Sequence, residues 1–188
     1  QAVLADLDRA GVHEILSLGD TIGYGPEPEE VVQALRARDA VSVMGNHELA
    51  LVSRSYRARM HGSARDSLDR TRGLPGAGPV AWVEDRLDCL VRRGGRLVHG
   101  CPPRSMTVYL FSPSANRLQR VFAAYPEGLC FAGHTHTLEL FGEAGGAVSQ
   151  RRLGLGPLAL AGAGRSLLLC GSVGQPRDHL DRRAKYLL

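Results

Sequence analysis

Apolar residues in the first quarter of the chain alternate between helical spacing and short continuous runs. Residues 1–10 carry apolar side chains on one helical face and are followed by a glycine, which predicts a helix that ends there. The runs HEILSLGD (13–20) and AVSVMGNHE (40–48) have the apolar content of buried strands. Between them, an acidic first turn predicts a helix from about 29 to 38.

The rest of the chain first shows a weak helical pattern and then a pattern of strands. Helices are expected near 47–55, 63–72 and 79–87. CLVRRGGRLVHGCP (89–102) predicts two strands that turn at Gly94 and Gly95. A further helix is expected at about 116–124, just before the apolar run GLCFAGHTH (128–136). The later apolar runs, each expected to be a strand, are 138–142, 146–152, 158–162, 166–173 and 184–188.

Composition limits the class of protein. With 188 residues, 44% of them hydrophobic and 22% charged, we expect one globular domain over residues 1–188. The succession of expected helices and strands favours the α/β class. The net charge of +4 is carried by scattered arginines and only 5% of residues are aromatic, so stable nucleic-acid binding is not indicated. The apolar stretch 153–174 is broken by Pro157, Arg165 and several glycines, and we expect no membrane partner.

The cysteines indicate a reducing compartment. None of the four belongs to a CxxC pair, and a chain of this length does not depend on a disulfide framework. We therefore expect reduced, mostly buried thiols and a cytoplasmic location. The four are Cys89, Cys101, Cys130 and Cys170.

Four apolar runs end at a glycine-flanked polar residue that can bind a metal ion. These residues are Asp20, Asn46, His99 and the pair His134 and His136. The carboxyl ends of strands in α/β sheets form the crevice where ligands bind, so we expect the side chains to converge. Their oxygen and nitrogen atoms suit divalent ions of the manganese, iron or zinc type.

Each of these residues also has a purely structural interpretation. Asp20 and Asn46 can be turn or helix-cap residues, and His99 can be a half-buried, hydrogen-bonded histidine. If the backbone of GHTH is extended, His134 and His136 point to the same side, and two imidazoles beside an apolar strand need partners. Because the structural interpretations require four coincidences, the metal site is favoured.

Three other histidines have no such setting. We expect them at the surface, at His13, His61 and His179.

The order of these motifs resembles a known family. GD (19–20), GNHE (45–48), HG (99–100) and GHTH (133–136) are similar to the signature of the calcineurin-like metallophosphoesterases. The longer stretches GDTIGYGPEP (19–28) and GSVGQPRD (171–178) resemble, more narrowly, a branch of small bacterial phosphodiesterases that is YfcE-like and diadenosine-tetraphosphatase-like.

The resemblance implies a fold and a metal centre. The fold is a four-layer α-β-β-α sandwich with helices outside, and the centre holds two divalent ions of the manganese, iron, zinc or nickel type, manganese first. Asp20 is implied to bridge the ions and His47 to donate a proton to the phosphate and leaving group. The remaining implied ligands are Asn46, His99 and His134 at one site and His136 at the other.

One part of the family pattern does not appear in the sequence. The resemblance places an Asp-x-His motif on a first strand, ahead of the opening helix, and no residue precedes Gln1 here. One carboxylate, Asp20, leaves most of the charge of two divalent ions uncompensated. We expect the sequence to lack its first strand and to be truncated at both ends, with weak or absent turnover and at most one well-occupied metal site.

The activity implied by the resemblance is metal-dependent hydrolysis of phosphate esters by a metal-activated water. The implied substrates are phosphodiesters, nucleotides or phosphorylated small molecules. The alternatives are a catalytically inactive scaffold or binding module with the same fold, and a basic nucleic-acid-binding domain. Retention of His47, His99, His134 and His136 favours the enzyme.

Overall fold

The computed structural model describes residues 1–72, 81–83, 86–160, 164–178 and 181–188. By its internal contacts the chain divides into two units, which we call unit 1 (Gln1–Leu87, with Leu188) and unit 2 (Asp88–Leu187). Each unit has its own cluster of buried apolar side chains. One domain over residues 1–188 stays a prediction.

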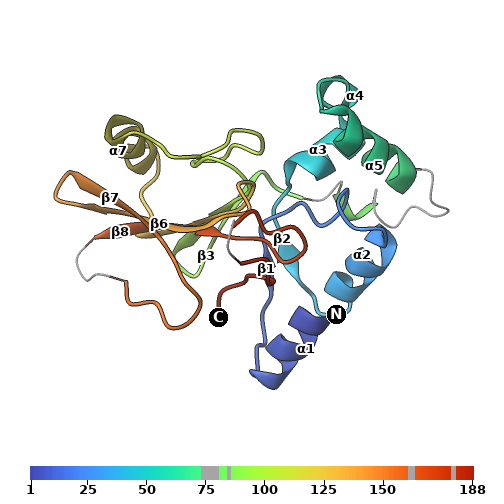
Figure 1. Ribbon diagram of the computed structural model, residues 1–188, viewed down its shortest axis with the longest axis horizontal. Coiled ribbons are helices and arrows are strands. Elements are labelled where there is room, and N and C mark those ends of the chain that lie inside the picture. Colours follow the sequence, from blue (N-terminus) through green and yellow to red (C-terminus); the bar gives the residue numbers. More distant parts are fainter. Residues whose placement is uncertain (73–80, 84–85, 161–163, 179–180) are drawn as a thin grey trace. The chain divides into compact units, whose positions relative to one another are not determined.

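Unit 1 consists of helices and two short parallel strands (Figure 1). The strands are β1 (Leu16–Ser17) and β2 (Val41–Ser42). The helices are α1 (Ala2–Arg9), α2 (Pro28–Arg36), α3 (Asn46–Val52), α4 (Arg54–Arg57) and α5 (Gly62–Arg72). The opening helix and the helices expected near 29–38, 47–55 and 63–72 are thus confirmed.

The helix expected at 79–87 can be checked only in part, because the structure does not describe all of these residues. Residues 81–83 are helical, whereas Arg86 and Leu87 are not. Residues 79–80 and 84–85 lie outside the described residues.

Local sequence explains how unit 1 places its strand ends. Pro28 begins α2 and acidic residues occupy its first turn, which suits the free N–H groups there. Val32 of α2 is buried in the core of unit 1. Because β1 and β2 are parallel and adjacent, their carboxyl ends lie at the same edge. The buried members of this core are Ile22, Val32, Ala50, Leu51, Leu68, Trp82 and Val83.

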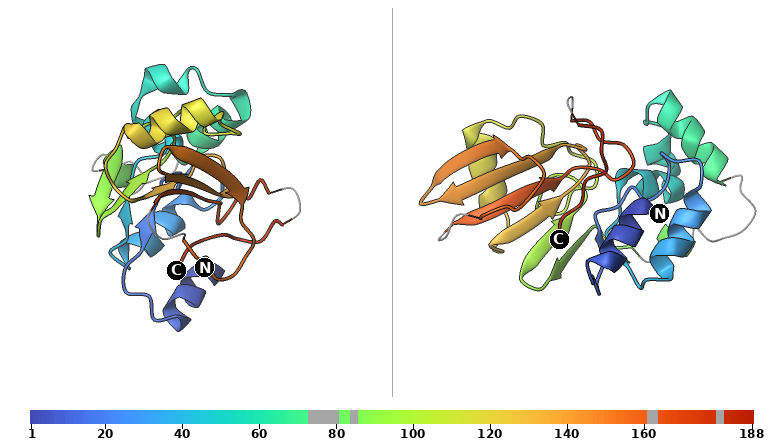
Figure 2. Two further views of the ribbon diagram at one scale, coloured as in Figure 1. Left: turned by 90° about the vertical axis from the view of Figure 1, so that its left-hand side faces the viewer. Right: turned by 60° about the horizontal axis from the view of Figure 1, so that its bottom comes forward.

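Unit 2 is built on a six-stranded mixed sheet with the order β3-β4-β5-β8-β6-β7. Its strands are β3 (Cys89–Arg92), β4 (Gly95–Val98), β5 (Leu129–Ala132), β6 (Leu138–Ala144), β7 (Ala147–Arg152) and β8 (Arg165–Cys170). The adjacent strands β4, β5 and β8 are parallel, and the other pairs are antiparallel. Helix α7 (Ala115–Ala123) packs against β6 and β7 on one face of the sheet (Figure 2).

The core of unit 2 lies between α7 and the sheet. Leu118, Val121 and Phe122 are the buried residues of the helix. Phe122 and Phe141 of β6 are among its largest fully buried side chains. No helix among the described residues of either unit has both the length and the apolar character that crossing a bilayer requires.

Arginine side chains fix the connection from α7 to β5. The guanidinium of Arg165 donates hydrogen bonds to the carbonyls of Phe122, Tyr125 and Glu127, which closes the carboxyl end of the helix. Arg96 donates two hydrogen bonds to the Glu127 carboxylate at 2.8 and 3.0 Å. This pairing lowers the pKa of Glu127.

Three sequence expectations for unit 2 are wrong. The β3-β4 hairpin turns at Arg93 and Gly94, which have φ of 50° and 76°, and Gly95 is already in β4. Positive φ at both central residues matches the twist of the two strands. The described residues 158–160 are not in a strand, because they join neither of the two sheets, and 161–162 lie outside the described residues. Residues 184–188 form no strand either.

Candidate functional site

The ends of β1 and β2 approach each other closely because both carry glycine. A Cβ atom on Gly19, whose φ is +85°, would lie 2.5 Å from the backbone nitrogen of Gly45. A Cβ atom on Gly45 would lie 2.2 Å from Oδ1 of Asp20. These glycines in GD and GNHE therefore allow the backbone to bring Asp20 against the beginning of α3.

Asp20 is held in an uncommon backbone conformation. Its φ is 54°, in the left-handed region, which costs a residue other than glycine about 1 kcal/mol or more. Its Oδ1 accepts a hydrogen bond from the backbone N–H of His47 at 3.0 Å. The helix-cap interpretation of Asp20 is thus correct for one carboxylate oxygen, although the helix belongs to a distant segment of the chain.

Glu48 organises this part of unit 1, and the sequence assigned it no role. Its carboxylate is buried, with the residue only 1% exposed. The oxygens accept hydrogen bonds from Asp20 N (2.8 Å), Thr21 N (2.7 Å), Thr21 Oγ1 (2.8 Å) and Gly45 N (2.9 Å). Its position three residues after Gly45, at the start of a helix, is a capping signal that sequence inspection can find.

His47 is buried beside Asp20 and packs on an aromatic ring. It is 2% exposed, and its imidazole stacks on Tyr24 with a centroid distance of 4.2 Å and an interplanar angle of 28°. A Cβ atom on Gly23 would lie 2.1 Å from the Nδ1 of His47, so the loop fits closely around the ring. Asn46, the first residue of α3, is also buried. Asp20, Asn46 and His47 are therefore neighbours at one edge of unit 1.

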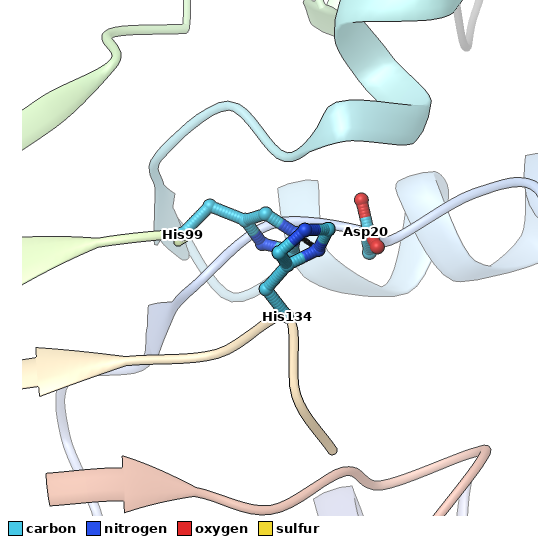
Figure 3. Close-up of side chains that lie close together, drawn as sticks. All are labelled: Asp20, His99 and His134. Atoms are coloured by element: carbon cyan, nitrogen blue, oxygen red, sulfur yellow. Dashed lines mark hydrogen bonds between the residues drawn. The ribbon is translucent and has the colours of Figure 1, made fainter. Parts of the chain in front are cut away.

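In unit 2, two histidines follow adjacent parallel strands. His99 comes directly after β4, and His134 follows β5 by one residue. Their imidazoles face each other, with His99 Nε2 and His134 Nδ1 3.1 Å apart (Figure 3). His99 is 1% exposed, so it is fully buried, not half-buried as its structural interpretation assumed.

The second nitrogen of His134 identifies its tautomer. Nε2 lies 3.2 Å from the carbonyl oxygen of Thr107. Because a carbonyl only accepts hydrogen bonds, Nε2 carries the proton and Nδ1 presents its lone pair toward His99. A carbonyl partner of this kind commonly orients histidines that bind metal ions.

The histidine pair fits a divalent metal ion. Two nitrogens that each bind one ion at about 2.0–2.1 Å, with angles between octahedral and tetrahedral, lie about 2.9–3.4 Å apart. The separation of 3.1 Å between His99 Nε2 and His134 Nδ1 is within this range. The same distance accommodates one shared proton, so the pair stays hydrogen bonded when no ion is bound.

His136 is oriented by a separate carbonyl. Its Nδ1 lies 2.8 Å from the carbonyl oxygen of Gln175, which leaves Nε2 as the nitrogen with the lone pair. The extended backbone expected for GHTH is wrong, since β5 ends at Ala132 and His134 and His136 have φ of 61° and 62°. Both histidines adopt the left-handed backbone conformation. The rule that alternate residues of a strand point to the same side therefore does not apply to them.

The segment after β8 holds His136 in place. The N–H of Arg177 donates to the carbonyl of His136 at 3.0 Å, and Oδ1 of Asp178 accepts from Leu138 N at 3.1 Å. The ammonium of Lys185, the only lysine in the chain, lies 3.3 Å from Oδ2 of Asp178. Lys185 is 5% exposed. The motif GSVGQPRD marked this segment in the sequence but not its contacts with His136.

The exposure of the other histidines and of the cysteines can be compared with expectation where the structure describes them. His13 and His61 are exposed, as predicted, and His179 lies outside the described residues. All four cysteines are free thiols, and Cys101 and Cys130 are buried. Burial raises the pKa of the Cys130 thiol to about 12, so it stays protonated at neutral pH and is a poor metal ligand.

The predicted site residues thus form two groups. Unit 1 brings Asp20, Asn46 and His47 together. Unit 2 brings His99 and His134 together and fixes His136 on the same short segment. Their assembly into one metal centre stays a prediction.

Known proteins resemble this chain over most of its length. A family model described as calcineurin-like phosphoesterase matches residues 1–138. An uncharacterised protein of Methanocaldococcus jannaschii is 29% identical over 198 residues, which cover 96% of this chain and 73% of that protein. The crystal structure of a metallophosphoesterase from Sphaerobacter thermophilus is 30% identical in sequence, with a TM-score of 0.78, and the match covers 97% of this chain and 75% of that one. The predicted α/β class and the family resemblance are confirmed.

Proposed function

Because this chain belongs to the calcineurin-like phosphoesterase family, we propose that it is a metal-dependent hydrolase of phosphate esters. Members of the family bind divalent metal ions as a rule. The proposed substrates are phosphodiesters, nucleotides or other phosphorylated small molecules. The motifs GDTIGYGPEP and GSVGQPRD support placing it in the YfcE-like and diadenosine-tetraphosphatase-like bacterial branch.

The observation that carries this proposal is the histidine pair of unit 2. His99 Nε2 and His134 Nδ1 are separated by a distance that suits two ligands of one ion, and the carbonyl of Thr107 fixes the His134 tautomer needed for binding. Such an arrangement of buried imidazoles is costly unless each ring nitrogen is hydrogen bonded or bound to a metal ion.

We assign the ligands as the sequence resemblance implies. Asp20 would supply the carboxylate that holds divalent ions, with manganese as the first candidate. The other ligands are Asn46, His99, His134 and His136. When bound, such ions activate water for attack on phosphorus and neutralise charge on the phosphoryl group.

His47 is the proposed proton donor. Its backbone N–H is bonded to Asp20 and its ring is stacked on Tyr24, so its orientation relative to Asp20 is fixed within unit 1. An imidazole held in this way can hydrogen bond a phosphoryl oxygen or protonate the leaving group. General acid catalysis of this kind contributes about 10²- to 10⁴-fold in rate.

We also propose that the 188-residue chain turns over slowly by itself. Asp20 is the single carboxylate among the proposed ligands, and the other four are neutral. Two divalent ions then keep most of their charge in a partly dry site, which weakens occupancy of at least one of them. A cytoplasmic location is proposed as well, since all four cysteines are free thiols.

Manganese binding and ester hydrolysis, measured on the same samples, test the proposal. Titration calorimetry with Mn²⁺ reports binding, and bis-p-nitrophenyl phosphate with added Mn²⁺ reports hydrolysis. We expect His134→Ala to weaken Mn²⁺ binding at least about tenfold, because a ligand is lost, and Asp20→Ala to abolish detectable turnover. The matched control is His61→Ala, which removes an exposed imidazole from unit 1.

Two outcomes contradict the assignment in different ways. If His134→Ala and His61→Ala bind Mn²⁺ as the wild type does, the histidine pair is structural. If metal binds but no ester is hydrolysed even with Mn²⁺ in excess, the inactive scaffold with the same fold is the better description.

A further inference from the structure

Two exposed aromatic side chains lie in the loop that connects His99 to α7. Tyr109 is 39% exposed and Phe111 is 47% exposed. Their rings are stacked, with centroids 4.9 Å apart and an interplanar angle of 12°. Scattered apolar residues are ordinary on a protein surface, but a stacked pair of rings leaves a face of its outer ring, here Phe111, available to a planar partner.

The same stack reaches a proposed metal ligand. The ring of Tyr109 lies on the imidazole of His134, with centroids 3.6 Å apart and an interplanar angle of 16°. His134 is buried, whereas Phe111 is exposed. Three rings therefore lead from the candidate metal ligand to the solvent within unit 2.

The loop is held in place without a ligand. The N–H of Cys101 donates to the carbonyl of Val108 at 2.8 Å, and Val108 N donates to Oγ of Ser105 at 3.0 Å. Arg117 of α7 donates to the carbonyl of Tyr109 at 2.6 Å. Because these bonds fix the backbone at Val108 and Tyr109, the inner ring of the stack is ordered before any partner binds.

We propose that Tyr109 and Phe111 form a binding subsite for the planar aromatic group of the substrate, a nucleobase on the phosphoester. This inference rests on the proposed phosphoesterase function. A base has two flat faces and stacks on aromatic side chains with little dependence on its identity. The stack begins at His134, so a base on Phe111 extends a row of rings that starts at the proposed metal ligand.

A purely structural role makes a different prediction. If Tyr109 only packs on His134, the outer ring of Phe111 contributes nothing to substrate choice. Phe111 stacks on Tyr109 and Tyr109 stacks on His134, so substitution of Phe111 leaves the ring that lies on the proposed metal ligand in place.

Three p-nitrophenyl esters separate these roles in the Mn²⁺-loaded protein. Thymidine 5′-(p-nitrophenyl phosphate) carries a base, bis-p-nitrophenyl phosphate carries a second aryl ring, and ethyl p-nitrophenyl phosphate carries neither. We expect Phe111→Ala to lower kcat/KM for the thymidine ester about 5- to 100-fold, mainly through KM, and to change the ethyl ester less than about twofold. Phe111→Trp should restore the activity. Leu155→Ala, which removes another exposed apolar side chain of unit 2, is the control.

Each outcome decides the inference. A loss confined to the thymidine ester supports a nucleobase site, and an equal loss for bis-p-nitrophenyl phosphate shows that any aryl group is accepted and overturns the nucleobase assignment. Equal effects on all three esters overturn the subsite. If no ester is hydrolysed, the proposed function fails, and equilibrium dialysis with adenosine 5′-monophosphate then tests the subsite alone. An unchanged affinity in Phe111→Ala refutes it.

Discussion

The buried carboxylate of Glu48 offers the sharpest test of how unit 1 positions Asp20. It accepts four hydrogen bonds, three from backbone N–H groups and one from the Thr21 hydroxyl. In Glu48→Ala these donors lose their acceptor inside a site that is 1% exposed. A buried donor left without a partner costs about 1–3 kcal/mol, and water entering the space reduces the sum, so we expect a loss of about 3–5 kcal/mol in the free energy of unfolding.

Glu48→Gln should be less harmful. An amide oxygen placed at the Oε2 position still accepts from Asp20 N and Gly45 N, and the Thr21 hydroxyl can rotate to accept from the new NH₂ group. Only the N–H of Thr21 then faces another donor. We therefore expect Glu48→Gln to cost about 1–3 kcal/mol, less than the alanine variant.

Urea unfolding followed by tryptophan fluorescence measures both variants. The only tryptophan, Trp82, is 3% exposed in the core of unit 1, so its emission reports on the unit that contains Glu48. Glu27→Gln is the matched control in the same unit, because the Glu27 side chain is exposed and makes no capping hydrogen bond to α2. Its expected change is below about 0.5 kcal/mol. If Glu48→Ala is no more harmful than this control, the four hydrogen bonds do not position the loop of Asp20.

Two further changes test the close contacts of the candidate site. Gly45→Ala places a Cβ atom 2.2 Å from Asp20 Oδ1 and should cost about 1–3 kcal/mol in urea unfolding and weaken Mn²⁺ binding, whereas Gly25→Ala, with no atom within 4 Å, should be neutral. Equal effects of the two alanines would count against the close approach of the strand ends. Lys185 is 5% exposed, so its ammonium should be protected from reagents in the folded protein. We expect N-hydroxysuccinimidyl acetate to acetylate the α-amino group of the native protein and to acetylate Lys185 only in urea. Peptide mapping that finds Lys185 acetylated in the native protein contradicts the contacts described for it.

Short-range pattern was sufficient for most of the elements. Helices α1, α2 and α7 were predicted from the spacing of apolar residues and from the charged residues near their ends. Both signals depend on residues within one or two helical turns of each other. The same reasoning failed for residues 158–160 and 184–188, which have strand-like composition. A strand needs a neighbour with an available edge, and composition does not say whether one exists.

The candidate ligands, and the strands that precede them, could be identified from the sequence alone. Asp20, His99 and His134 follow apolar runs at glycine-flanked positions, and the carboxyl ends of adjacent parallel strands share an edge whatever the details of packing. Order and spacing of these motifs also identified the family.

Contacts between distant segments, in contrast, select the ring nitrogens of His134 and His136 that keep a lone pair. The carbonyls of Thr107 and Gln175 fix the protons on His134 and His136, and the Glu48 carboxylate holds the loop of Asp20. Every residue has a carbonyl group, so the one that meets an imidazole has no signature in the sequence. The choice is made by backbone conformation and by contacts between distant segments, which a linear pattern does not contain.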